Sequence, residues 1–67
     1  MTKTHRIAFA EGWLAGSLWG APSNREAAAA LDAMGLPTDG AHVAIYANGA
    51  DDGVAGDYHR LDQMEAK

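Results

Sequence analysis

The chain has 67 residues, no cysteine, and nine acidic against five basic side chains, for a formal charge of −4. A chain this short makes one domain at most, here residues 1–67, with a small core and little room for a catalytic pocket. Without cysteine it has no disulfide and no thiolate metal site. No apolar run approaches the roughly 20 residues of a membrane span, and the N-terminus lacks the apolar core of a secretion signal. We therefore expect a soluble, cytoplasmic protein.

Residues 7–19 follow a frayed polar stretch at residues 1–4 and alternate in a way that predicts a β-hairpin. The predicted turn is Glu11-Gly12, where glycine supplies a positive φ. Strand side chains alternate between the two faces, so one face would carry the larger apolar residues and form the core. The other face would carry small residues together with Trp13 and Trp19.

A helix is predicted over residues 25–34. Ser23 and Glu26 form a Ser-x-x-Glu capping box ahead of an alanine-rich segment of high helix propensity. Gly35 and Pro37 end the helix, and Leu36 is placed to fold back on Leu31 in a Schellman motif. The predicted buried stripe of this helix consists of Ala27, Leu31 and Met34.

Alternation over residues 42–47 predicts a third strand, with Val43 and Ile45 in the core. Residues 49–57 hold three glycines and three aspartates, which predicts an acidic loop. Residues 58–67 are expected to form a loose tail, either a short helix capped by Asp57 or an edge strand. The predicted fold is therefore α+β: a three-stranded antiparallel sheet in the order strand–strand–helix–strand, with one helix packed on it.

No pattern in the sequence predicts catalysis. A calcium loop starting at Asn48 would need oxygen ligands where Ala50 and His59 stand, and His5 and His42 are too far apart in sequence to form a zinc motif with His59. No nucleophile elbow and no phosphate-binding loop occurs. We expect no enzymatic activity, no metal and no cofactor.

The two tryptophans have two interpretations. They either belong to a second small core that the tail covers through Tyr58 and Leu61, or they anchor an interface with a second copy or another protein. Tyr46 could join the same face. The protein is accordingly expected to be a monomer or a homodimer.

Between Arg25 and Arg60 the chain has no lysine or arginine. Direct binding to nucleic acid needs clustered basic residues, so the charge pattern disfavours it and favours a basic partner. The same acids also keep a small protein soluble, which is the simpler explanation. Six carboxylates are predicted to contact the partner: Glu26, Asp32, Asp39, Asp51, Asp52 and Asp57.

The segments Glu11-Gly12-x-Leu14-x-Gly16-x-Leu18-Trp19, residues 26–34, Ala44-Ile45-Tyr46 and Asp51-Asp52-Gly53 together resemble the layout of one domain of ArdA-type antirestriction proteins. The resemblance covers residues 5–56. In size and acidity the chain is also similar to phage-encoded anti-CRISPR proteins.

These resemblances imply a counter-defence protein of a phage or mobile element, active in the bacterial cytoplasm. Acting as a DNA mimic, it would occupy the basic DNA-binding site of a host CRISPR or restriction effector through its carboxylates. Trp13 and Trp19 would add apolar anchoring. The alternative is a homodimeric interaction module that uses the Trp13/Trp19 face.

Overall fold

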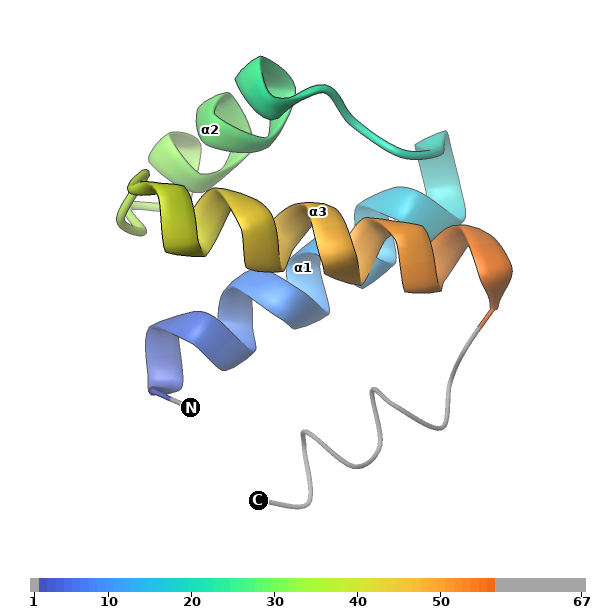
Figure 1. The fold of residues 1–67 in the computed structure, drawn as a ribbon, viewed down its shortest axis with the longest axis horizontal. Coiled ribbons are helices and arrows are strands. Elements are labelled where there is room, and N and C mark those ends of the chain that lie inside the picture. Colours follow the sequence, from blue (N-terminus) through green and yellow to red (C-terminus); the bar gives the residue numbers. More distant parts are fainter. Residues whose placement is uncertain (1, 57–67) are drawn as a thin grey trace.

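The structure is a computed structural model that describes residues 2–56, and those residues form three α-helices. Helix α1 spans Lys3–Trp19, α2 spans Asn24–Ala33 and α3 spans Gly40–Ala55. Figure 1 shows α1 and α3 crossing the molecule in the same direction, with α2 lying to one side of them. No residue from 2 to 56 is in a strand. The predicted α+β fold with a three-stranded antiparallel sheet is therefore wrong.

Helices α1 and α3 touch through glycines on their facing surfaces. Gly12 and Gly16 of α1 and Gly49 and Gly53 of α3 are all buried. A Cβ atom built on Gly16 would lie 2.6 Å from the carbonyl carbon of Ala50, closer than real Cβ atoms approach other atoms. The other three glycines face the opposite backbone at similarly short distances. Since a side chain at these positions would force the helices apart, glycine is what allows this close approach.

The predicted hairpin at residues 7–19 is replaced by α1. Its buried positions repeat every three to four residues, as on one face of a helix: Ala8, Phe9, Gly12, Trp13, Ala15 and Gly16. Gly12 is therefore not a turn residue but a contact residue. Residues 2–4 belong to the start of this helix: Thr2 is its N-cap and its hydroxyl accepts a hydrogen bond from the His5 N–H at 3.3 Å.

The predicted helix is confirmed as α2, within one residue at each end. The Ser23 hydroxyl accepts from the Glu26 N–H at 3.2 Å, and the Glu26 carboxylate accepts from the Ser23 N–H at 2.9 Å. At the other end Gly35 has φ +73°, and the Leu36 N–H donates to the Leu31 carbonyl at 2.9 Å. Both the capping box and the Schellman motif therefore form as predicted.

A small core joins the three helices. Ala27 and Leu31 of α2 are fully buried, together with residues of both other helices. Met34, predicted to share this stripe, is instead 40% exposed. The central members of the core are Ala8, Ala15, Ala27, Leu31 and Tyr46.

The predicted third strand and most of the acidic loop together form α3. Its buried positions again have helical spacing: His42, Tyr46, Gly49, Ala50 and Gly53. Val43 and Ile45, predicted as core residues of a strand, are only partly buried. The predicted tail at residues 58–67 and the Asp57 carboxylate lie outside the described residues. Over residues 2–56 no helix combines the length and apolar character that crossing a membrane requires.

Candidate functional site

The predicted acidic residues are spread over α2 and α3. Glu26 and Asp32 lie on α2, Asp39 stands at the N-cap position of α3 without a side-chain capping hydrogen bond, and Asp51 and Asp52 lie in the last turns of α3. All are exposed except Asp52, which is partly buried. Asp39 and Asp51 are separated by about 18 Å along α3, at 1.5 Å per residue.

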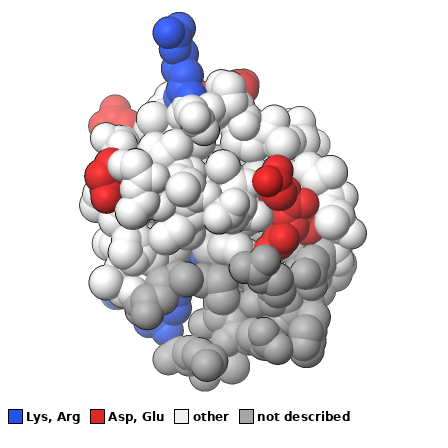
Figure 2. Space-filling view, viewed as in Figure 1, with Lys and Arg blue, Asp and Glu red and all other residues white. Residues whose placement is uncertain are grey.

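These carboxylates do not converge on one point. On the face drawn in Figure 2 the visible Asp and Glu side chains form separate red patches on a largely uncharged surface. Glu26 and Asp32, six residues apart on α2, also point in different directions. The structure therefore presents separated negative charges and not one continuous anionic cluster on this face.

The two tryptophans do not share a face, because α1 is a helix and they are six residues apart. Trp13 is 6% exposed and packs where α1 meets α3. Trp19, in the last turn of α1, is 81% exposed. Of the predicted pair of anchors, only Trp19 presents its ring to the surface.

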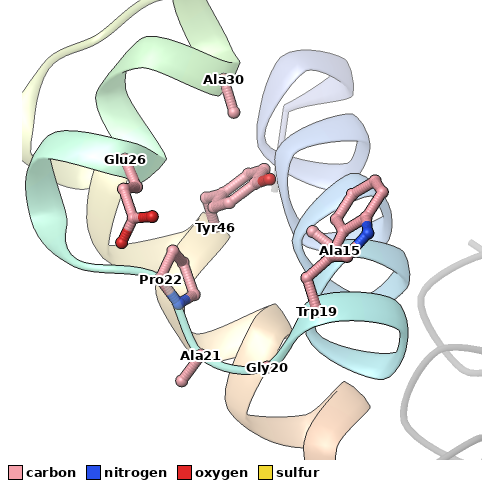
Figure 3. Close-up of a pocket in the computed structure, with 8 residues that line it drawn as sticks. All are labelled: Ala15, Trp19, Gly20, Ala21, Pro22, Glu26, Ala30 and Tyr46. Carbon is pink, nitrogen blue, oxygen red and sulfur yellow. The ribbon is translucent and has the colours of Figure 1, made fainter.

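Trp19 borders a pocket of about 240 Å³ between the C-terminal half of α1, the following linker, α2 and α3. In Figure 3 Glu26 and Trp19 lie on opposite sides of the opening, with Tyr46 and Pro22 on the sides between them. The lining residues are Ala15, Trp19, Gly20, Ala21, Pro22, Glu26, Ala30 and Tyr46.

Two ionisable groups of the pocket have shifted pKa values. Burial raises the pKa of the Tyr46 hydroxyl, and the nearby negative charge of Glu11 acts in the same direction. The hydrogen bond that the Ser23 backbone N–H donates to Glu26 is the main cause that lowers the pKa of Glu26 below its usual 4.5, and the hydrogen bond with the Ser23 side chain acts in the same direction. Near neutral pH the pocket therefore carries a neutral phenol and a carboxylate anion.

A polar cluster joins the N-terminal ends of α1 and α3. His42 is 6% exposed; its Nδ1 lies 2.5 Å from Asp39 Oδ1 and its Nε2 lies 2.9 Å from Thr4 Oγ1. A neutral ring protonated at Nδ1 satisfies both contacts, donating to the carboxylate and accepting from the hydroxyl. The His5 ring lies 4.3 Å from the His42 ring, centroid to centroid. His42 is therefore buried where the two helix ends meet.

The order carboxylate–imidazole–hydroxyl is also the arrangement that activates a serine or threonine nucleophile. Here, however, the pocket residue nearest to the cluster along α3 is Tyr46, one helical turn beyond His42. None of the three residues lines that pocket. The cluster therefore fits a structural role: it gives both ring nitrogens of the buried His42 a hydrogen-bond partner and connects the N-terminal ends of α1 and α3. Its sequence signal was the i, i+3 spacing of Asp39 and His42, which suits a contact within one helical turn.

Helix α1 also has an exposed apolar row that sequence reasoning missed. Ile7, Leu14 and Leu18 are 37%, 49% and 61% exposed and lie on the side away from the α3 contact. Their spacing of seven and four residues places them on one helical face. That spacing was visible in the sequence, but the assumed strand period assigned these residues to the core.

Within residues 2–56, no group of three His, Asp or Glu side chains is arranged to hold a metal ion. Comparisons with known proteins gave no further guide to the site. No protein-family model, no curated protein and no solved structure matched this chain.

Proposed function

We propose that this protein acts by binding another protein, without catalysis, and that its partner presents a basic, nucleic-acid-binding surface. The supporting observation is the distribution of charge. From residue 23 to residue 56 the chain has five carboxylates and a single basic side chain, Arg25. The lysine and the other arginine of the described residues, Lys3 and Arg6, lie at the start of α1. Such an excess of carboxylates over basic side chains attracts proteins rich in lysine and arginine and repels nucleic acid.

The partner proposed is the DNA-binding site of a bacterial restriction or CRISPR effector, as the resemblances suggested, and the protein would inhibit it in the cytoplasm. Because the carboxylates are separated along α2 and α3, they would meet basic side chains at several points of an extended groove. Each contact at an exposed site contributes at most about 1 kcal/mol. The inhibition should therefore be strongly weakened by salt.

The test is displacement of labelled DNA from a purified effector by this protein. Asp32→Asn and Asp51→Asn should each weaken inhibition by up to about fivefold, and together by more. Ser17→Lys is the control, since it makes the same change in net charge at an exposed position on α1. Inhibition that survives the double substitution, or that Ser17→Lys weakens equally, would show that these carboxylates do not carry the function.

The exposed apolar row on α1 favours a second candidate, a homodimer in which the rows of two copies pack together. Small domains often gain stability by such association, and a helical row of isoleucine and leucine can form this kind of contact. The interface differs from the predicted Trp13/Trp19 face, because Trp13 is buried inside the fold.

Sedimentation over a range of concentrations up to millimolar tests this candidate. Leu14→Gln with Leu18→Gln should convert the dimer to a monomer, whereas Val54→Gln should not. Val54 is the matched control because it is 58% exposed but lies on α3, outside the row. A wild-type protein that stays monomeric throughout removes the candidate.

A further inference from the structure

We infer that the pocket beside Trp19 binds an arginine side chain of a partner protein. Its volume of about 240 Å³ is below the roughly 300 Å³ at which pockets for drug-sized ligands begin. It therefore suits a single side chain, not a cofactor or a large metabolite. Its residues come from all three helices and the first linker, so the fold has to form before the site exists.

The walls of the pocket favour a cation. Trp19 and Tyr46 supply two aromatic side chains, and Pro22 supplies an apolar ring on a third side. The face of an aromatic ring attracts a cation, most strongly for tryptophan. Trp19 is 81% exposed, so a stacked guanidinium would cover indole surface that otherwise faces water.

The charge of the pocket points the same way. Glu26 is the one charged side chain among the lining residues, and it is negative. One of its oxygens accepts the Ser23 N–H at 2.9 Å. A carboxylate offers about four acceptor positions, so it can still accept hydrogen bonds from a ligand while it caps α2. In Figure 3 its carboxylate and the Trp19 ring lie on opposite sides of the pocket, with Tyr46 and Pro22 between them.

Arginine fits these walls better than lysine. Its guanidinium is planar, stacks on aromatic rings and is weakly hydrated, so it gives up water more readily than an ammonium does. It also donates several hydrogen bonds in one plane, which suits a carboxylate at the edge of the site. That the bound arginine belongs to a basic partner protein rests on the proposed function. The affinity of the pocket for a guanidinium does not depend on it.

The experiment is an NMR titration of the whole chain with N-acetyl-arginine methylamide, following the Trp19 indole N–H and the Tyr46 ring signals. The citrulline analogue is the matched ligand, because it has nearly the same shape and no charge. We expect saturable shifts at both residues and binding of the arginine compound at least about fivefold tighter than that of the citrulline compound.

Two variants assign the binding to the pocket. Trp19→Ala should abolish it, and its fold can be checked by circular dichroism. Glu26→Gln should remove the preference for arginine over citrulline without unfolding α2, because glutamine also serves in a capping box. Asp32→Asn, which removes a carboxylate from the same helix outside the pocket, should bind like wild type.

Equal binding of the two compounds, an unchanged preference in Glu26→Gln, or no saturable shift at the two aromatic residues would each overturn the inference. The titration contains no partner protein and no DNA. Failure to displace DNA from an effector, with arginine binding intact, would therefore count against the proposed function alone. Loss of arginine binding with DNA displacement intact would count against the pocket alone.

Discussion

Replacing Gly16 by alanine tests the backbone contact between α1 and α3. In an exposed helix this change would stabilise the protein by about 1 kcal/mol, since alanine is the better helix former. Here the new Cβ would lie 2.6 Å from both the carbonyl carbon and the Cα of Ala50, and the carbonyl oxygen is nearer still. Ordinary contact begins at 3.4 Å, and the atoms in the way are helix backbone, not the tip of a flexible side chain.

The two helices would therefore have to separate. Overpacking of a core typically costs about 1–3 kcal/mol, and an unyielding backbone places this case at the upper end. After subtracting the gain in helix propensity, we expect Gly16→Ala to lower the free energy of unfolding by about 2 kcal/mol. In a domain of this size that corresponds to a fall in Tm of about 8–16 °C.

Thermal and urea unfolding followed by circular dichroism at 222 nm measure the effect. Gly40→Ala is the control, because Gly40 lies in the first turn of α3 and no atom would lie within 4 Å of its new Cβ. It should leave Tm unchanged or raise it. If Gly16→Ala is as stable as wild type, or is stabilised like the control, the helices do not meet through their backbones at this point.

The remaining predictions concern the caps and the polar cluster. The His42 hydrogen bond lowers the pKa of Asp39 below its usual 3.8, so the folded state holds this proton more weakly than the unfolded state does. The stability that this hydrogen bond contributes is present above about pH 3.8 and is lost as the pH falls through the lower pKa of the folded state. The urea midpoint of unfolding should therefore fall less between pH 5 and pH 2 in Asp39→Asn than in wild type. His42→Ala removes two part-buried hydrogen bonds and should lower the free energy of unfolding by about 1–3 kcal/mol in the same assay, whereas an effect within error would leave the cluster no structural role. Ser23→Ala should cost about 1 kcal/mol by removing the N-cap of α2, while Glu26→Gln should cost much less; equal losses would contradict the capping geometry.

The sequence could be read correctly where the structural signals are local. The start and end of α2 depend on hydrogen bonds within a few residues of Ser23 and Gly35, so the capping box and the Schellman motif needed no knowledge of the rest of the chain. Residues 7–19 lack such local signals, and their periodicity is ambiguous. Alternation of period 2 and a helical repeat both fit a short segment in which alanine, glycine and large apolar residues are mixed.

The same ambiguity hid the candidate site. Glycine marks a turn when it supplies a positive φ, but it also marks the closest contact between two helices. The alternating pattern predicts a turn at Gly12 and a loop at Gly49, although Gly12-x-x-x-Gly16 and Gly49-x-x-x-Gly53 have the spacing of one helical face. A hairpin over residues 7–19 puts Trp13 and Trp19 on one face and the exposed Leu18 in the core.

Helix α2, with both of its ends, and the excess of acidic over basic side chains follow from the amino-acid sequence, because these depend on neighbouring residues or on composition alone. Three further features depend on how the helices pack: α1 and α3 are helices in backbone contact, Trp13 is buried while Trp19 is exposed, and Trp19, Tyr46 and Glu26 border one pocket. The physical reason is that a glycine or alanine carries too little side chain to specify its own environment. What it packs against depends on residues more than thirty positions away in the chain.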